Sequence, residues 1–322
     1  TIFVVILLIF YAFSLPKKLF TKPTSTVITS STDELLGALI ANDGQWRFPH
    51  NDSVPEKFKT CLIQFEDEYF YGHPGFNPVS ILKAIKLNLQ ANGVQRGGST
   101  ITQQVIRLSR DDKPRTYFEK LKELILATRL EFRFSKEKII SFWSSNAPFG
   151  GNVVGLDAAS WRYFNRKAAN LSWAESATLA VLPNAPRLIY PGKNQQKLLE
   201  KRNRLLEKLL DKKIIDSLTF ELAILEELPQ KPYSLPQEAP HLLQKINTLK
   251  KGKYVKTTID RKLQEQVNSI VENQYQILKN NEIHNIAVLV LDVKTRQVLT
   301  YVGNSPTTNK NQKYVDIITK PR

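Results

Sequence analysis

Two short polar blocks carry the side chains that are best suited to chemistry. Residues 66–75 combine the acidic Glu66 and Asp67 with His73 in a run that is otherwise rich in aromatic residues and glycine. Residues 97–104 bring hydroxyl and amide groups on Ser99, Thr100, Gln103 and Gln104. A carboxylate can take a proton from an attacking hydroxyl, and neutral donors can bind a polyhydroxylated, phosphorylated substrate. The two blocks therefore predict proton transfer on such a substrate.

The same blocks resemble the first two motifs of the family 51 peptidoglycan glycosyltransferases, the glycan polymerases of class A penicillin-binding proteins. The matching patterns are E-D-x-x-F-x-x-H-x-G from Glu66 and G-G-S-T-I-T-Q-Q from Gly97. The segment from Arg115 to Glu123 resembles the third motif, R-K-x-x-E. The interval between Glu66 and Glu123 is that of the family, with no gap.

The resemblance implies a role for each matched residue. Glu66 corresponds to the glutamate proposed to deprotonate the acceptor hydroxyl. Glu123 corresponds to a second catalytic carboxylate near the pyrophosphate, where it would hold a divalent cation such as Mg²⁺ or Mn²⁺. Arg107 stands where the family usually has lysine, and it keeps a cation for the pyrophosphate. The substrate-binding positions are Asp67, His73, Ser99, Thr100, Gln103, Gln104, Arg107, Arg115 and Lys120.

Other interpretations of these residues stay open from the sequence. Glu123 could form a surface ion pair with Lys120, three residues before it. His73 is interpreted as bracing its loop through Asp67 rather than transferring a proton, and Phe70 as a core residue. Ser80-Ile-Leu-Lys83 spells S-x-x-K, the acylation motif of penicillin-binding enzymes, but it lies on a helix inside the glycosyltransferase segment and is not expected to act as a nucleophile.

The chain also departs from the family pattern. Glu119 stands where the third motif has arginine, and Phe142-Trp-Ser-Ser145 stands where the fourth motif usually reads Leu-Tyr-Leu-Asn. The segments 146–151 and 155–161 resemble the penicillin-binding protein 1C subgroup. Because of these departures, two alternatives remain: a degenerate glycosyltransferase that acts as a cell-wall synthesis scaffold, and a lysozyme-type enzyme that cleaves glycan.

Composition limits the class of partner. The chain has 322 residues, 42% hydrophobic and 24% charged, with a formal net charge of +16. An ordinary globular protein with that charge is expected to meet an anionic partner. No nucleic-acid-binding motif is evident, so anionic lipid or a pyrophosphate is favoured over nucleic acid. The single cysteine, Cys61, lies in an apolar run and is interpreted as core, and the histidines show no zinc-ligand spacing.

The predicted fold is mainly α: a lysozyme-like glycosyltransferase domain, followed by a partial α/β transpeptidase domain. Apolar periodicity predicts helices over residues 81–89, 100–108, 117–132, 136–143, 158–164, 173–182 and 194–212, and Ser172 with Glu175 predicts a capping box. Short strands and turns are expected over 33–52, and residues 286–292 and 298–302 are expected to form a hairpin. The expected divisions are a truncated membrane anchor at 1–15, a stalk leading into the first motif at 16–44, the glycosyltransferase domain at 45–228, a Pro-rich linker at 229–252, and the amino-terminal fragment of the transpeptidase domain at 253–322. The apolar run at the start contains no charge, and the chain contains no methionine, which suggests that its true beginning has been cut off.

The resemblance implies polymerisation of lipid II into β-1,4 glycan strands, with release of polyprenyl pyrophosphate. The implied partners are lipid II, the nascent glycan strand, membrane lipid and cell-wall synthesis proteins. The implied location is the bacterial cytoplasmic membrane, with a single-pass anchor and the catalytic domain on its outer, periplasmic side. Transpeptidase activity is not expected from this chain.

Overall fold

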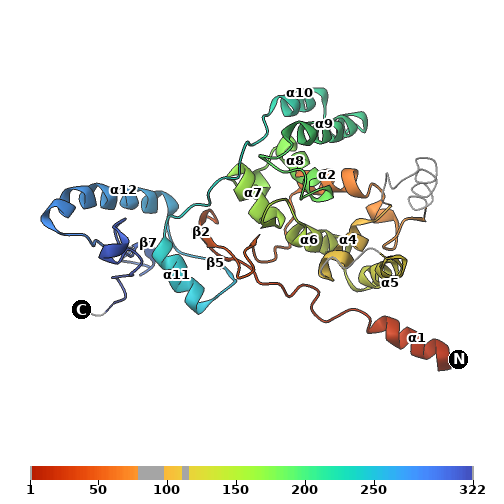
Figure 1. Ribbon diagram of the computed structural model, residues 1–322, viewed down its shortest axis with the longest axis horizontal. Coiled ribbons are helices and arrows are strands. Elements are labelled where there is room, and N and C mark those ends of the chain that lie inside the picture. Colours follow the sequence, from red (N-terminus) through yellow and green to blue (C-terminus); the bar gives the residue numbers. More distant parts are fainter. Residues whose placement is uncertain (1, 79–97, 111–115, 321–322) are drawn as a thin grey trace. The chain divides into compact units, whose positions relative to one another are not determined.

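The computed structural model describes residues 2–78, 98–110 and 116–320. The chain forms two compact units, one comprising residues 1–22 and 50–233, the other residues 23–49 and 234–322. Helices predominate in the described part and the strands are short (Figure 1), which confirms the mainly α prediction. The motif Ser80–Lys83, the helix expected from Ile81, and Arg115 lie outside the described residues.

Helices are the main regular structure of the first unit. Most of them fall where apolar periodicity predicts them, and several begin at a Ser or Thr cap. Ser172 caps its helix reciprocally with Glu175, as the sequence predicts. The helices are α1 (Ile2–Ala12), α2 (Glu56–Glu66), α4 (Ile101–Ser109), α5 (Tyr117–Arg133), α6 (Lys136–Asn146), α7 (Leu156–Phe164), α8 (Trp173–Val181), α9 (Gln195–Asp211) and α10 (Ser217–Leu225).

The core of this unit surrounds α8, whose residues are almost all buried. Helices α2 and α9 pack on α8, and α10 packs on α9 (Figure 1). Beside α2, the rings of Phe58, Trp143 and Phe149 form a buried aromatic cluster with centroids 6.3 to 6.4 Å apart. Cys61 is fully buried in the same helix, as expected, and burial raises the pKa of its thiol.

The second unit contains two small sheets. In the first, β1 (Thr26–Thr29) pairs antiparallel with β2 (Leu35–Leu39) and parallel with β5 (Tyr254–Lys256). In the second, β6 (Val288–Leu291) and β7 (Val298–Val302) form the expected antiparallel hairpin. Helices α11 (Pro240–Leu249) and α12 (Arg261–Leu278) complete this unit, together with the short β3 (Trp46–Arg47). Ile28, Leu36, Leu243, Ile259 and Tyr301 pack together in its core.

This division differs from the one expected from the sequence. Residues 26–29, expected in the stalk, form the fully buried strand β1. Residues 35–39 lie in the entry segment, where short strands and turns are expected, and form the almost wholly buried strand β2. A strand of four residues gives little periodicity, and its parallel partner β5 is distant in the sequence. Residues 240–249, expected in the linker, form α11, because Pro240 occupies the first turn, where a missing N–H costs nothing.

The expected membrane anchor corresponds to α1, which has 11 residues and is apolar throughout. Within residues 2–78, 98–110 and 116–320, no helix combines the length and the apolar character needed to cross a bilayer. The helix contacts α5 in the same unit: the Tyr11 hydroxyl lies 2.9 Å from that of Thr128, and Arg129 donates to the carbonyl of Ala12.

Gly75, in the first motif, touches the backbone of α5. Its φ is +97°, and a Cβ on this residue would lie 2.7 Å from the carbonyl oxygen of Ala127. We expect Gly75→Ala to lower the free energy of unfolding by about 1–3 kcal/mol, because both the backbone conformation and the contact disfavour a side chain. Thermal unfolding compares it with Gly72→Ala, whose Cβ would meet no described atom within 4 Å. Equal stability of the two variants would contradict the prediction.

Candidate active site

Asp67 joins the first two motifs. Both of its carboxylate oxygens face Nε2 of His73, at 3.0 and 3.1 Å, and Oδ2 accepts a hydrogen bond from the backbone N–H of Ile101 at 3.0 Å. Asp67 and His73 are buried. Because Ile101 is the first residue of α4, the carboxylate also lies at the positive end of that helix. This confirms that His73 braces the loop through Asp67.

The surrounding bonds fix the tautomer of His73. The backbone N–H of Gly75 donates to Nδ1 of His73 at 3.2 Å. Since that nitrogen accepts, the ring proton is on Nε2, and a neutral imidazole donates it to Asp67. Thr100 completes the framework: its hydroxyl donates to the Gly75 carbonyl at 2.7 Å and caps α4 by accepting from the backbone of Gln103.

Glu66 is the last residue of α2, immediately before Asp67. Its Oε2 accepts a hydrogen bond from Nε2 of Gln104 at 2.7 Å. The other end of that amide, Oε1, accepts from Nε1 of Trp143 at 2.9 Å. Gln104, predicted to bind substrate, is therefore bonded to protein at both ends of its amide.

Burial raises the pKa of Glu66 above its ordinary value of 4.5. The hydrogen bond from Gln104 and the positive charges of Arg107 and Lys201 act in the opposite direction and stabilise the carboxylate. A carboxylate with a raised pKa is a stronger base than an ordinary glutamate. Glu66 thus has the environment of a general base.

Sequence reasoning missed Lys201. It lies on α9, and its ammonium group donates to Oδ1 of Asn184 at 2.7 Å while its charge acts on Glu66. Burial lowers the pKa of Lys201, and Glu66 opposes that shift. The only available signal was its place in a basic helix. Two turns further along α9, the ammonium group of Lys208 donates to the carbonyl of Gln64 at 2.6 Å and so holds α9 against the end of α2.

A second cluster lies between α4 and α5, around Lys120. Its ammonium group donates to the hydroxyl of Ser99 at 2.7 Å and to Oε1 of Gln103 at 3.0 Å. The same nitrogen lies 3.5 Å from Oε2 of Glu123, and Nε of Arg107 lies 4.0 Å from the other oxygen of that carboxylate. The structure therefore brings together five of the residues that the sequence predicted for the phosphate-binding part of the site.

Glu123 does not behave as a solvated surface residue. The ion pair with Lys120 is present, but only 12% of the Glu123 side chain is exposed, and Arg107 flanks it on the other side. Two cations beside one carboxylate leave this cluster with an excess of positive charge. Such an arrangement suits a ligand that carries several negative charges.

The same cluster does not fit a metal cage built by the protein. Divalent cations take several oxygen ligands, and Glu123 offers one carboxylate with two cations next to it. In residues 2–78, 98–110 and 116–320, no group of three or more His, Cys, Asp or Glu side chains could hold a metal ion. A divalent cation at Glu123 stays a prediction, and no step of the mechanism depends on it.

With this geometry established, comparison with known proteins decides the family. The sequence pattern of the transglycosylase family matches residues 33–210, more than half of the chain. The chain belongs to this family.

Two sequence relatives support the assignment. Penicillin-binding protein 1C of Escherichia coli (strain K12) is 34% identical over 263 residues, 81% of this chain and 34% of that protein. Penicillin-binding protein 1A of Aquifex aeolicus (strain VF5) is 32% identical over 203 residues, 63% of this chain and 28% of that protein. The chain thus spans about a third of the length of these relatives. A crystal structure of penicillin-binding protein 1A from Haemophilus influenzae covers 79% of this chain and 29% of its own, at 17% identity and a TM-score of 0.37.

In this transglycosylase, Glu119, which departs from the motif expected for the family, forms an ion pair with a neighbouring arginine. Oε2 of Glu119 lies 2.6 Å from Nη2 of Arg110, the residue that ends α4, and both side chains are about one-fifth exposed. Lys122 approaches the other carboxylate oxygen at 3.9 Å. The acidic residue therefore joins the end of α4 to the first turn of α5.

A charge exchange tests this pairing. Glu119→Arg should destabilise the protein by about 1–2 kcal/mol, because it places two guanidinium groups together and leaves Arg110 without its carboxylate. Arg110→Glu should destabilise the protein to a similar degree, because it places two carboxylates together. The double variant Arg110→Glu/Glu119→Arg should recover most of the loss in a denaturant unfolding cycle. A double variant as unstable as the sum of the two singles would show that the pair contributes nothing.

Proposed function

We propose that this transglycosylase is a peptidoglycan glycosyltransferase that polymerises lipid II into β-1,4 glycan strands and releases polyprenyl pyrophosphate. The observation that carries the proposal is the combination of a partly buried base, Glu66, with a cationic cluster around Glu123, and Arg107 acts on both carboxylates. Sugar transfer from a pyrophosphate needs both, because one hydroxyl must lose a proton while a highly charged group departs. Membership of the transglycosylase family supports the same reaction class.

In the proposed mechanism, Glu66 takes the proton of the acceptor hydroxyl as its oxygen attacks the anomeric carbon. The C–O bond to the pyrophosphate breaks at the same carbon, and attack from the face opposite the leaving group inverts its configuration. An α-linked pyrophosphate thereby yields a β-linked glycan. Arg107 and Lys201 stabilise the ionised form of Glu66 and so keep it ready to accept the proton.

The leaving pyrophosphate is proposed to bind at the cluster around Lys120 and Arg107. Ser99 and Gln103 hold the ammonium group of Lys120, which fixes the cation before substrate arrives. Glu123 lies between the two cations and keeps them from repelling each other. Preorganised charges of this kind favour the transition state, in which negative charge builds up on the departing oxygen.

Replacement of the proposed base tests the function directly. Glu66→Gln should abolish polymerisation of labelled lipid II, with a loss of at least about 10²–10⁴-fold, because the amide is nearly isosteric but cannot accept the proton. Glu56→Gln is the matched control, since Glu56 lies in the first turn of the same helix and its side chain is 78% exposed. Glycan chains are separated by gel electrophoresis. Normal turnover in Glu66→Gln would end the assignment.

The same assay gives a pH dependence with a defined sign. Only ionised Glu66 can act as a base, so activity should fall as the pH drops through its pKa. Because burial raises that pKa, the fall should begin at a higher pH than for an ordinary glutamate.

In the wild-type assay, cleavage of ready-made glycan without polymer would favour a lysozyme-type enzyme, and no reaction would favour a scaffold.

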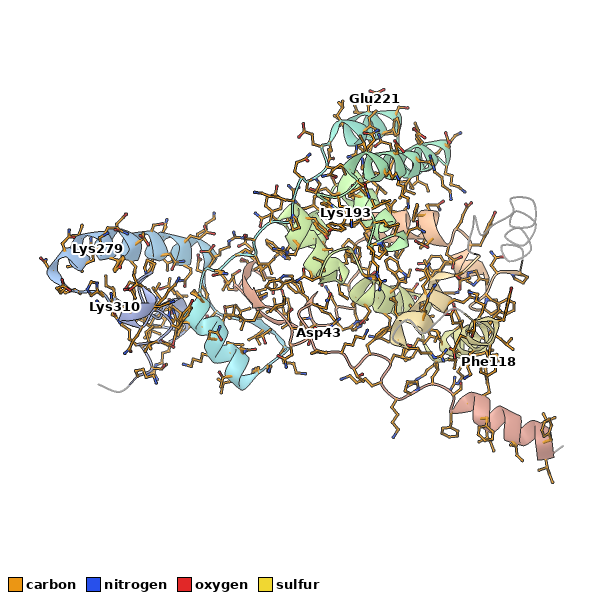
Figure 2. All side chains as sticks on the ribbon, viewed as in Figure 1. Asp43, Phe118, Lys193, Glu221, Lys279 and Lys310 are labelled. Atoms are coloured by element: carbon orange, nitrogen blue, oxygen red, sulfur yellow. The ribbon has the colours of Figure 1, made fainter. Side chains whose placement is uncertain are left out.

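The proposed location is the outer face of the bacterial cytoplasmic membrane, where a polyprenyl substrate resides. The apolar helix α1 and the exposed apolar side chains of α5 support this location. Phe118, Leu121, Ile125 and Phe132 are all exposed at spacings that place them along one side of α5, and Phe118 is labelled on that helix in Figure 2. The ammonium group of Lys122 lies 4.4 Å from the ring centroid of Phe118, which adds a cation at the same place.

Vesicle binding tests the contribution of α5. Phe118→Ser/Leu121→Ser should weaken binding to phosphatidylglycerol vesicles at least about tenfold, because each lost apolar side chain removes area that would enter the interface. Leu218→Ser/Leu222→Ser on α10 is a matched control with similar exposure, 65% and 59% against 64% and 56%. Co-sedimentation measures both. Equal loss in the two variants would show that α5 has no special role.

The second unit is proposed to be the amino-terminal part of a transpeptidase domain. Its hairpin β6–β7 and the long helix α12, which packs on β7, are compatible with the start of an α/β domain. Lipid II, the growing glycan and cell-wall synthesis proteins are the proposed partners of the whole protein.

A further inference from the structure

We propose that Trp143 is a positioning residue: its indole N–H fixes the side-chain amide of Gln104 in the orientation that donates to Glu66. The catalytic consequence rests on the function proposed above, whereas the effect on the titration of Glu66 does not. The three side chains form a chain of two hydrogen bonds, from Trp143 to Gln104 at 2.9 Å and from Gln104 to Glu66 at 2.7 Å.

Hydrogen-bonding chemistry decides the direction of this chain. An indole nitrogen can only donate, an ionised carboxylate can only accept, and a glutamine amide has one accepting and one donating end. If the amide were turned over, two donors would face each other at Trp143 and two acceptors at Glu66. Only the observed orientation satisfies all three groups, so the donor-only indole selects it.

Trp143 is held firmly enough to impose this choice. Its side chain is fully buried, and its ring packs against both Phe58 and Phe149. The contact with Phe149 is edge to face, with an interplanar angle of 82°. Phe58 belongs to α2, the helix that ends at Glu66, so the indole and the carboxylate rest on a shared core.

The hydrogen bond from Gln104 favours the ionised form of Glu66, and burial opposes it. An amide free to turn over would present its carbonyl oxygen to the carboxylate for part of the time. That contact favours the protonated acid, so losing the indole N–H should raise the pKa of Glu66 further. It should also leave the plane of the carboxylate less well defined.

The test is the titration of Glu66 in the full chain, followed by NMR of ¹³C-labelled glutamate carboxyl groups and assigned with Glu66→Gln. Trp143→Phe should raise the pKa of Glu66 by about 0.5–1 unit, and Gln104→Met by about one unit or more, since each weakens a bond to a charged group. The control is Trp161→Phe, which replaces another buried tryptophan by phenylalanine and should leave the titration of Glu66 unchanged.

A double variant shows whether Trp143 acts through Gln104. In the Gln104→Met background, Trp143→Phe should produce no further shift, because the amide that carries the effect is gone. An equal further shift would overturn the proposal, as would a wild-type titration in Trp143→Phe. If Trp143→Phe fails to fold, benzothienylalanine at position 143 keeps the shape of the ring and removes only the N–H donor.

Measurement of turnover is an independent test of the role of Trp143. Trp143→Phe should lower kcat about threefold to tenfold at neutral pH with little change in KM, and should move the acid limb of the pH profile upward with the pKa of Glu66. A shifted titration in a protein that makes no glycan would support the positioning and reject the proposed function. Normal polymerisation with an unshifted titration would support the function and reject the positioning.

Discussion

The buried carboxylate of Asp67 is the interaction on which the rest of the site depends. It binds the neutral ring of His73 and the first N–H of α4, and it thereby joins the end of α2 to the start of α4. Glu66 precedes Asp67 directly, and Gln104 follows the capped start of α4 by one turn. Fixing Asp67 against α4 therefore brings Glu66 and Gln104 together without any long-range adjustment.

Two different balances of charge exist within this framework. Around Glu66, burial raises the pKa of the carboxyl group, and one amide and two cations limit that rise. Around Lys120, the cations outnumber the carboxylate, and neutral groups orient them. The first arrangement suits a base that must gain a proton. The second suits a ligand that is already negative. Arg107 contributes to both, and the difference in burial and charge between the two environments allows both tasks at one pH.

The sequence predicted much of this site, because short motifs place their residues on adjacent helix ends. Glu66, Asp67, His73 and the hydroxyl and amide groups of the second motif were all expected, and the capped helix α8 was expected from Ser172 and Glu175. Lys201 and Trp143 were missed as parts of the site. Each comes from a helix outside the first two motifs, and only packing shows that it reaches Glu66 or Gln104. The strand pair β1–β5 was missed for the same reason, since its partners are far apart in the sequence.

The departures from the family pattern also have physical consequences that a motif cannot show. An arginine at position 119 would add a cation to a segment that already contains Arg107, Arg110 and Lys120. With glutamate there instead, Arg110 is neutralised, while Arg107 and Lys120 still flank Glu123. The positive charge is thereby concentrated where Ser99 and Gln103 hold it in place. The motif therefore has one basic residue fewer, but the cluster around Lys120 keeps the cations that can bind an anion. The change affects mainly where the positive charge lies.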